Sequence, residues 1–427
     1  MADALVMVAG GDPIESLGGH STYVRAHARA ACRMGFAPHL FCVSRREGRV
    51  ETDFGIVHLV RSPWRLRRAH GAWGFRHHLI WLHAPLLARR LERFVRDQRP
   101  AGIMHAFGVW GSAAVGAART LARGGRRIAV VVNAYTTLEH EFRAKLRGTT
   151  SDHGPFRRLQ AAIDLAAVKV IVERHERRAY TGSDRVLVNY ESVRHLLVAK
   201  WGSGLPVSRV AYAAETAFLA GGGAGAAPPL LPPGEAPLVV AVSRQDPRKG
   251  VDVLIRALAR LRALDVPFRA ALLGGGPLLE RHRRLCAAAG LDDRVVLPGY
   301  VPEPAAYLRR AAVFALPSLQ EASGSVSLLE ALQAGVAVVA SAIDGIPEDV
   351  TDEQSALLVP AGDAEAVAAG LRRVLTDPFL RARLAGAGQA AFRERFSAEA
   401  LTTALRRVYA DLGVIAARSP FLADGSR

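Results

Sequence analysis

Two glutamates, Glu321 and Glu330, flank a loop of small residues within Ser318–Gly335, SLQEASGSVSLLEALQAG. An apolar, strand-like run (Ala311–Leu316) precedes the loop, and from Val326 the apolar residues follow helical spacing. A strand, a small-residue loop and a helix start together present free backbone N–H groups and the positive end of a helix dipole. This arrangement predicts an anion site, and phosphate is the usual anion there.

The two carboxylates cannot serve the phosphate itself, because like charges repel. They are better suited to accept hydrogen bonds from sugar hydroxyls. Phosphate and sugar recognised together indicate a nucleotide sugar. The plainer alternative is an ordinary helix start with two solvated glutamates.

Two cations, Arg244 and Lys249, follow a strand expected at Leu238–Val242. At such a turn they could clasp a diphosphate, with each charge-assisted hydrogen bond contributing about 1.5–3 kcal/mol. A departing nucleoside diphosphate gains negative charge in the transition state, so these cations would act where charge develops. The alternative is a solvated surface pair.

The stretch around the glutamates resembles the signature of glycosyltransferase family 4. There a Pro-Ser turn precedes E-x7-E, and the second Glu leads into Glu-Ala-Met/Leu-x-x-Gly. Glu330-Ala331-Leu332-Gln333-Ala334-Gly335 matches that second half. In the first half eight residues separate Glu321 from Glu330, so Ala322 stands in register with the family's first Glu. Glu321 takes that role if the loop bulges by one residue.

The resemblance covers residues 1–412 and is strong over 238–376, where four segments occur in family order. They are Arg244…Lys249-Gly250, Gly274–Pro277, Gly299-Tyr300-Val301 and Glu321…Glu330. It implies an α/β fold of the GT-B type, with two Rossmann-like doubly wound domains facing each other across a cleft, and retention of anomeric configuration. The chain has no D-x-D triplet, so neither a metal nor another cofactor is expected.

The resemblance also implies roles for the site residues. Glu330 would hold the ribose hydroxyls and Glu321 the hydroxyls of the donor sugar. Arg244, Lys249 and the N–H groups near Ser325 and Val326 would hold the diphosphate. Four further donor-side candidates come from the glycine-containing segments: Gly19, Gly275, Tyr300 and Val301.

The first half of the chain starts in the doubly wound style. A strand at Leu5–Ala9, a helix from Ser21 and a strand at Pro38–Ser44 follow one another. We expect His105 in the turn after one later strand and Tyr135 after the next, which makes both acceptor-side candidates. Tyr135 occupies the position where the family usually carries a His near the reacting sugar. His105 could instead be a structural hydrogen bonder.

Composition divides the chain into a basic domain at 1–220, a Gly/Pro-rich linker at 221–237 and a nucleotide-sugar domain at 238–397. The resemblance implies that a helix at 398–412 returns to the first domain, and a disordered tail is expected at 417–427.

Residues 1–220 carry 33 Lys and Arg against 17 Asp and Glu, a net charge of +16, and the remainder carries +1. A phosphorylated acceptor or an anionic membrane face would suit such a surface. No nucleic-acid-binding module is recognisable, which argues against nucleic acid. Trp64 among Arg65, Arg67 and Arg68 favours an interfacial patch, with a solvated loop before an amphipathic helix as the alternative.

Three cysteines, Cys32, Cys42 and Cys286, lack C-x-x-C spacing and are interpreted as buried thiols in a reducing compartment. The N-terminus has no basic leader, and no apolar run approaches membrane-spanning length. A cytoplasmic protein is expected, either free or peripheral on the inner face of the plasma membrane.

The sequence therefore predicts a retaining glycosyltransferase that moves a sugar from a nucleotide diphosphate donor to a glycan, a lipid-linked acceptor or a small molecule. No protein nucleophile can be assigned from the sequence. One alternative is a GT-B relative such as an epimerase or a sugar-phosphate synthase. Another is a catalytically degenerate nucleotide- or sugar-binding partner subunit.

Overall fold

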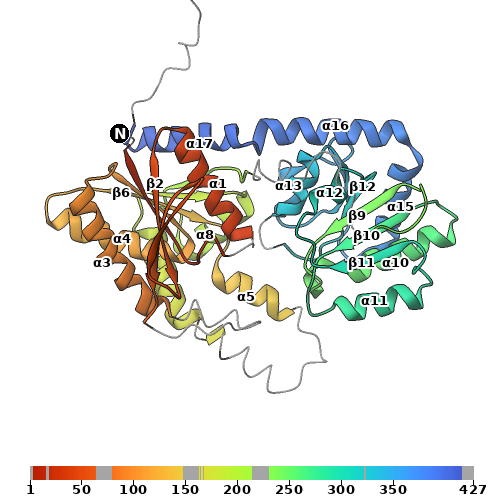
Figure 1. Ribbon diagram of the computed structural model, residues 1–427, viewed down its shortest axis with the longest axis horizontal. Helices are drawn as coiled ribbons and strands as arrows, with labels where there is room; N and C mark the ends of the chain where they lie inside the picture. Colours follow the sequence, from red (N-terminus) through yellow and green to blue (C-terminus); the bar gives the residue numbers. More distant parts are fainter. Residues whose placement is uncertain are drawn as a thin grey trace, which may run out of the picture.

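The computed structural model describes residues 3–15, 19–63, 79–147, 163, 165–166, 168–213, 230–321 and 324–415. The chain forms two α/β domains that lie side by side (Figure 1). Each domain is built around a largely or wholly parallel sheet covered by helices on both faces. Such sheets need apolar strands because both faces are buried.

The N-terminal sheet has eight strands in the order β3-β4-β2-β1-β5-β6-β7-β8. All neighbouring strands are parallel except β3 and β4. The strands are β1 (Ala4–Ala9), β2 (Ala37–Ser44), β3 (Gly48–Thr52), β4 (Gly55–Arg61), β5 (Ile103–Phe107), β6 (Ala129–Ala134), β7 (Arg185–Val188) and β8 (Val207–Arg209).

Residues of β1 alternate between the two faces of this sheet. Leu5 and Met7 pack in a cluster with α1 and α17, whereas Val6 and Val8 pack in a cluster with α3, α4 and α7. This is the two-residue period of a strand buried on both sides. The helices are α1 (Gly19–Arg33), α3 (Ile80–Gln98), α4 (Gly111–Arg123), α5 (Leu138–Arg147), α7 (Glu173–Thr181), α8 (Glu191–Trp201) and α17 (Ala398–Asp411), with short turns η1 (Gly108–Trp110) and η2 (Val168–Val172).

The C-terminal sheet has six parallel strands in the order β11-β10-β9-β12-β13-β14. They are β9 (Leu238–Val242), β10 (Arg269–Leu273), β11 (Val295–Gly299), β12 (Val313–Leu316), β13 (Ala337–Ser341) and β14 (Leu357–Val359). The helical elements of this domain are η3 (Pro247–Lys249), α10 (Val251–Ala263), α11 (Leu279–Ala288), α12 (Ala305–Leu308), α13 (Val326–Gln333), α14 (Ile346–Asp349), α15 (Ala364–Thr376) and α16 (Pro378–Arg395).

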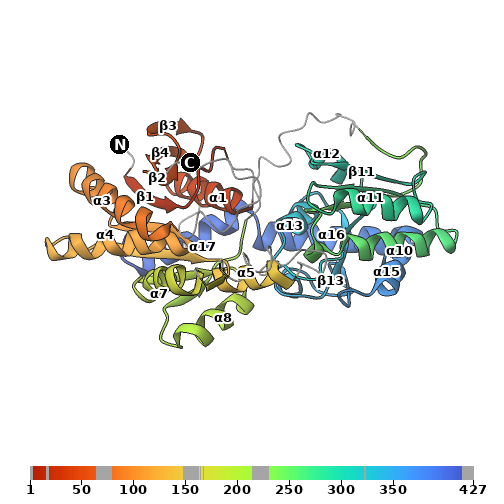
Figure 2. The same cartoon turned by 90° about the horizontal axis from the view of Figure 1, so that it is seen from below.

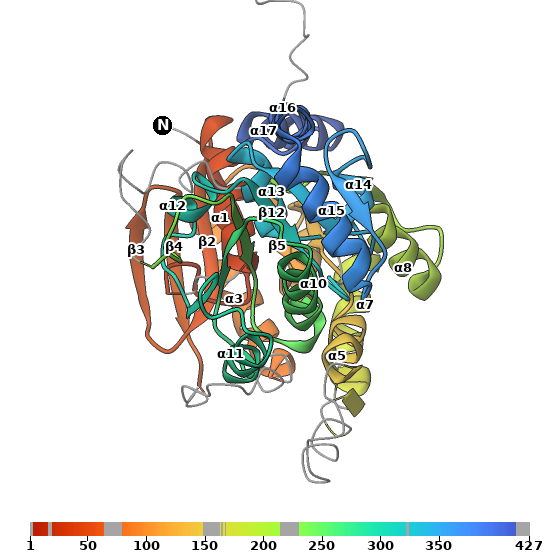
Figure 3. The same cartoon turned by 90° about the vertical axis from the view of Figure 1, so that its right-hand side faces the viewer.

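The last two helices connect the domains. Helix α16 packs against α13 and β13 of the C-terminal domain, and α17 then packs against α1 of the N-terminal domain. The two helices run almost in line across both domains in Figure 1, and Figure 3 shows them one behind the other. Figures 1 and 2 both place α5 on the side of the N-terminal domain that faces the C-terminal domain.

Two sequence-based expectations were wrong. His105 does not lie in a turn: it is an interior residue of β5 and is fully buried. Such a position arises because its polar ring finds hydrogen-bond partners within the core. Cys42 and Cys286 are buried as expected, but Cys32 near the end of α1 is exposed.

The patch Trp64–Arg68, most of the predicted linker and the predicted tail at 417–427 lie outside the described residues. Among the residues that the structure describes, no helix combines the length and apolarity needed to span a membrane.

Candidate functional site

The candidate site lies where the winding of the C-terminal sheet changes direction, between β9 and β12. From β9 the chain winds outward to β10 and β11, whereas from β12 it winds the other way to β13 and β14. The loops that leave the carboxyl ends of two such strands diverge and leave space for a ligand. Arg244 and Lys249 lie after β9, and Glu321 lies after β12.

Backbone contacts hold these two loops together. The carbonyl of Arg248 accepts hydrogen bonds from the N–H groups of Leu319, at 2.7 Å, and Gln320, at 3.1 Å. Gly250 has a positive φ of 59°, and a Cβ there would lie 2.1 Å from the carbonyl oxygen of Pro317. Only glycine permits both this backbone conformation and this close approach.

Lys249 and Glu321 form an ion pair across the two loops. The Lys249 Nζ lies 2.5 Å from the Glu321 Oε2, and the exposed fractions of the two side chains are 16% and 3%. The Ser318 hydroxyl donates to the Glu321 Oε1 at 2.5 Å, and the Glu321 N–H donates to the Asp344 Oδ2 at 2.6 Å. Both oxygens of Glu321 are thus occupied by protein groups. Ala322, in register with the family's first Glu, lies outside the described residues.

Arg244 differs from Lys249 in its exposure. Its side chain is 57% exposed and lies 4.0 Å from the carboxylate of Asp246, which is too long for a hydrogen bond. Asp246 instead caps η3 by accepting from the Arg248 N–H at 3.1 Å. Arg248, in the same loop, pairs with Asp246 at 3.3 Å. Lys249 and Arg248 are therefore each bound to a largely buried carboxylate, whereas Arg244 is mostly exposed to solvent.

Helix α13 begins at this edge of the sheet. Its N-cap residue, Ser325, has an extended backbone and makes no capping hydrogen bond to the helix. The Ser325 hydroxyl instead lies 3.0 Å from that of Ser327. The first N–H groups of α13, from Val326 onward, are therefore not satisfied by their N-cap and can receive an anion. Glu330 lies one turn further along α13, partly buried.

The other predicted donor-side residues lie on the neighbouring strands of the same edge. Gly274 has a φ of 124°, and a Cβ there would lie 1.9 Å from the carbonyl oxygen of Ser243. The loop after β10 thus packs on the loop after β9, and Gly275 accepts from the Gln245 N–H at 3.0 Å. Tyr300 follows β11 and is 64% exposed, with Val301 partly buried beside it. Gly19 belongs to the other domain, where it starts α1.

In the N-terminal domain a buried network of neutral hydrogen-bonding groups surrounds His105. Its Nε2 lies 2.5 Å from the Asn133 Oδ1, and its Nδ1 lies 2.6 Å from the Tyr409 hydroxyl on α17. The Asn133 amide nitrogen lies 3.0 Å from both the Tyr23 hydroxyl and the His27 Nε2. Since Asn133 Oδ1 only accepts, His105 Nε2 carries the proton and Nδ1 accepts from Tyr409.

Burial lowers the pKa of His105 to about 4, so the ring is neutral at physiological pH. His105 therefore connects α17 to the core and does not face the acceptor side. We expected this residue on the acceptor side, and the structure instead supports the alternative, a structural hydrogen bonder.

Tyr135 follows β6 and packs edge-to-face with Tyr23, at 4.4 Å between ring centroids, and with His20, at 5.4 Å. Its hydroxyl is buried and has no hydrogen-bond partner among the described residues. Burial raises the pKa of Tyr135 well above its usual value. Sequence reasoning identified Tyr135 but missed Tyr23 and Asn133. A polar residue ending the apolar run of β6 was the signal for Asn133.

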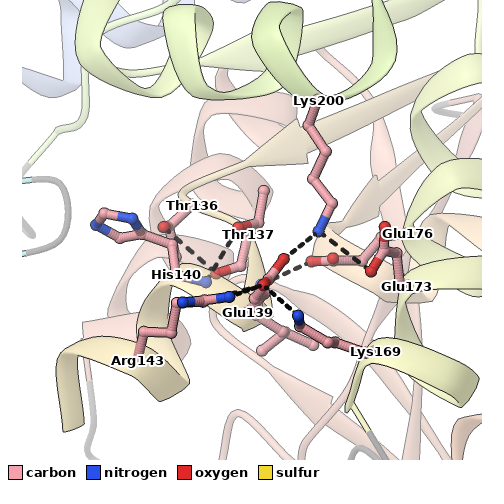
Figure 4. A network of polar contacts seen from close by, with 10 residues as sticks. Thr136, Thr137, Glu139, His140, Arg143, Lys169, Glu173, Glu176 and Lys200 are labelled. Carbon is pink, nitrogen blue, oxygen red and sulfur yellow. Dashed lines mark hydrogen bonds and ion pairs between the residues drawn. The ribbon is translucent and has the colours of Figure 1, made fainter. Parts of the chain in front are cut away.

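A charged network fixes the start of α5, which follows Tyr135 (Figure 4). Glu139 lies 2.8 Å from Arg143, 2.8 Å from Lys200 and 3.5 Å from Lys169. The hydrogen bond from Lys200 lowers the pKa of Glu139 to about 2. These contacts join α5 to η2 and α8, which were not foreseen as neighbours.

A second carboxyl group, that of Glu176, also contacts the start of α5, and its environment differs from that of Glu139. Glu176 on α7 is buried, and its Oε1 accepts from the Leu138 N–H at 2.8 Å. Its Oε2 is buried without a partner among the described residues. Burial raises the pKa of Glu176 to about 8. Glu176 is therefore mainly protonated at neutral pH.

The described residues contain no group of three or more His, Cys, Asp or Glu side chains arranged to hold a metal ion. The groups at the C-terminal sheet edge that can bind an anion are cations, backbone N–H groups and the dipole of α13.

Comparison with known proteins relates this edge to an enzyme family. Residues 227–391, which include every predicted site segment of the C-terminal domain, match the family model for glycosyl transferases group 1.

Two curated relatives match part of the chain. The GDP-mannose-dependent alpha-(1-6)-phosphatidylinositol monomannoside mannosyltransferase of Mycolicibacterium smegmatis is 37% identical over 164 residues, which are 36% of this chain and 43% of that protein. The lipopolysaccharide core biosynthesis glycosyltransferase LpsD of Rhizobium meliloti is 36% identical over 182 residues, 43% of this chain and 51% of that protein. The chain thus spans about half the length, or less, of these relatives.

Solved structures share the fold along nearly the whole chain. A sucrose-phosphate synthase from Thermosynechococcus elongatus superposes with a TM-score of 0.70 at 20% identity, covering 96% of this chain and 99% of that one. The Anabaena protein HepE in complex with UDP superposes with a TM-score of 0.64 at 16% identity, covering 96% and 100%. The predicted GT-B fold is thereby confirmed, and the match of residues 227–391 to glycosyl transferases group 1 agrees with the resemblance to glycosyltransferase family 4.

Proposed function

We propose that this protein transfers a sugar, with retention of configuration and without a metal ion, from a nucleotide diphosphate sugar to an acceptor. The observation that carries the proposal is the switch point of the C-terminal sheet. There Arg244 and Lys249 follow β9 and the uncapped start of α13 follows β12, within a domain that matches glycosyl transferases group 1. Charge that develops on a departing nucleoside diphosphate would be stabilised by these groups, and Lys249 is held in place for this by its ion pair with Glu321.

The relatives' names support a nucleotide-sugar donor. The mycobacterial relative is named as GDP-mannose-dependent, and one HepE structure holds UDP-glucose. In this chain the diphosphate would contact Lys249, Arg244 and the N–H groups near Val326. Glu330 would bind the ribose hydroxyls, and Gly275, Tyr300 and Val301 would line the donor from the neighbouring strands. Gly19, at the start of α1, would approach the donor from the other domain.

The structure refines the role of Glu321. Because both carboxylate oxygens are bound by Lys249 and Ser318, its first effect would be to fix Lys249 in place. That a donor-sugar hydroxyl donates a hydrogen bond to Glu321 stays a prediction, and it would require a carboxylate lone pair not used by these partners.

The acceptor would meet the donor at the N-terminal domain, near Tyr135 and the start of α5. A glycan, a lipid-linked sugar or a small molecule would fit this proposal. We further propose that a lipid-linked acceptor is reached at an anionic membrane surface. Helix α3 supports this, because Trp81 is 55% exposed and Arg89, Arg93 and Arg96 are exposed along the same helix.

One observation favours a second candidate, a nucleotide-binding partner subunit without transferase activity. Glu321 is buried and bound by Lys249 and Ser318, so the first carboxylate of the family signature could be unavailable for catalysis. This candidate and the transferase would bind nucleoside diphosphates alike, but only the transferase would release them from a sugar donor.

The test is incubation of the protein with a panel of nucleotide sugars in the presence of EDTA, following nucleoside diphosphate release. We expect release from at least one donor, increased by the correct acceptor. Binding without release from any donor would support the partner subunit. A strict requirement for Mg²⁺ would contradict the metal-independent mechanism.

A further inference from the structure

The turn between β7 and α8 of the N-terminal domain reaches the C-terminal domain through Tyr190. This residue is 3% exposed, and its hydroxyl donates to the Asp349 Oδ2 at 2.8 Å. Asp349 is 1% exposed and ends α14. A buried hydrogen bond to a carboxyl group is among the stronger ones in proteins. The two domains are therefore joined by a specific polar contact at this point.

Tyr190 also packs directly on the loop that precedes α13. A Cβ built on Gly324 would lie 1.8 Å from the Tyr190 Oη and 2.2 Å from the Cζ. The φ of Gly324 is not in the left-handed region, so its backbone would accept any residue. Glycine is required here because the Tyr190 ring occupies the space that a Cβ would need. Gly324 is followed by Ser325, the N-cap of α13.

Glu348, which precedes Asp349 in the chain, contacts the same turn between β7 and α8. Its carboxylate accepts from the N–H groups of Glu191, at 2.9 Å, and Ser192, at 3.2 Å, so it caps α8 across the domain boundary. Arg209 pairs with this carboxylate at 3.1 Å. Arg395 donates to the backbone carbonyls of both Glu348 and Asp349. These contacts hold Glu348 and Asp349 in place, and Asp349 in turn holds Tyr190.

We infer that Tyr190 of the N-terminal domain is a positioning residue for the donor site, because it sets the Gly324–Ser325 loop and hence the N–H groups of α13 that receive the diphosphate. This inference rests on the proposed function. Tyr190 acts through the loop and does not itself contact the donor. Donor binding and the contact between the domains then stabilise each other, since linkage between two equilibria is reciprocal.

The contact predicts an unusual pattern of mutational effects. Gly324→Ala places a methyl group against the tyrosine ring, so the loop must move and the diphosphate contacts must weaken. Tyr190→Ala in the same chain removes the ring and returns the space to that methyl group. The double variant should therefore bind nucleoside diphosphate better than Gly324→Ala alone, because residues in contact are not additive.

The test is calorimetric titration with UDP, GDP, ADP and dTDP of the wild type, Gly324→Ala, Tyr190→Ala/Gly324→Ala and Tyr190→Phe. We expect Gly324→Ala to lose about tenfold or more in affinity, and the double variant to regain about fivefold or more. Tyr190→Phe should lose affinity severalfold, because the ring loses the hydrogen bond that holds it to Asp349. Gly386→Ala is the matched control, because a Cβ there meets nothing within 4 Å. It should bind as wild type does.

Wild-type affinity in Gly324→Ala, or no recovery in the double variant, would overturn the inference while leaving the proposed function intact. If Gly324→Ala does not fold, Tyr190→Phe decides, and unchanged affinity in that variant would overturn it. If the wild type binds none of the four nucleotides, the proposed function fails and the inference fails with it.

Discussion

The strand ends of the two sheets carry different chemical groups. In the C-terminal domain the strand ends at the switch point present Arg244, the Lys249–Glu321 ion pair and the start of α13. In the N-terminal domain the strand ends are surrounded by tyrosine, histidine and asparagine side chains, with Tyr23 stacked on Tyr212 at 4.9 Å and bonded to Asn133. The strand ends of the C-terminal sheet offer charge, whereas those of the N-terminal sheet offer neutral hydrogen bonds and ring faces, with the charged Glu139 network beyond them at the start of α5.

This difference follows from what each edge would bind. A diphosphate carries fixed negative charge, which cations and helix N-termini stabilise. A sugar acceptor is neutral over most of its surface and is bound by rings and neutral donors. The net charge of +16 in residues 1–220 is therefore not explained by this edge, and arginines such as Arg89 and Arg93 instead lie exposed on α3.

The first prediction, which has the largest expected effect, concerns the removal of cations from the charged edge of the C-terminal sheet. Arg244→Ala and Lys249→Ala should each reduce turnover by about a hundredfold or more, because both cations would stabilise the charge on the departing diphosphate. Only Lys249→Ala should also lower the free energy of unfolding, by about 3–5 kcal/mol, since it leaves the buried Glu321 carboxylate unpaired. Steady-state kinetics and urea unfolding measure the two effects.

The double variant Lys249→Ala/Glu321→Gln is the control for that interpretation. It should recover much of the stability, because no unpaired buried charge remains, and it should stay inactive. Full turnover in Arg244→Ala would remove the diphosphate assignment of that residue.

The second prediction separates the two glutamates. Glu330→Gln should weaken nucleoside diphosphate binding, because Glu330 would hold the ribose. Glu321→Gln should depress turnover strongly and weaken nucleotide affinity less than Glu330→Gln does, since the loss falls on the placement of Lys249 and on the donor sugar. Calorimetry and product release measure both. A Glu321→Gln variant identical to wild type in both assays would show that the longer loop has displaced the first carboxylate from the site.

The third prediction concerns Glu176 in the N-terminal domain, whose buried carboxyl group is mainly protonated at neutral pH. Burial raises the pKa of Glu176 from 4.5 to about 8, so the folded chain holds a proton that the unfolded chain releases. The stability that this group contributes is present below about pH 4.5 and is lost as pH rises to about 8. Glu176→Gln should flatten this dependence in urea unfolding measured at several pH values. Glu92→Gln on α3, which is partly exposed, should keep the wild-type slope.

The smallest expected effect tests where the basic charge acts. Arg89/Arg93/Arg96→Ser should weaken binding to anionic liposomes about tenfold to a hundredfold, because basic residues near such a surface contribute about 1 kcal/mol each. Binding should also weaken as salt rises. Arg281/Arg284/Arg372→Ser removes the same charge from the C-terminal domain and should bind like wild type. Equal losses in both variants, or equal binding to zwitterionic liposomes, would argue for a soluble acceptor.

The apolar runs and their Gly and Pro boundaries predicted the strands that build the site. The run before the glutamates became β12, and the run at Leu238–Val242 became β9 with the same bounds. Strand order and turn position follow from patterns that are local in the sequence, so Arg244, Lys249 and Glu321 could be assigned to one sheet edge in advance.

Contacts between distant residues could not be predicted in this way. Lys249 and Glu321 are 72 residues apart, and no local pattern shows that they pair. His105 was assigned to a turn because a histidine interrupts an apolar run, but its partner Tyr409 lies 304 residues away on α17 and satisfies the ring in the core. The contact of Tyr190 with Gly324 likewise depends on how the two domains meet.

The most direct test of the central claim is a crystal structure of the protein with bound UDP or GDP. The account predicts that the diphosphate lies within hydrogen-bond distance of the Lys249 Nζ and of the N–H groups at the start of α13, with the ribose at Glu330. A nucleotide bound instead at the edge of the N-terminal sheet, or with its diphosphate away from α13, would contradict it.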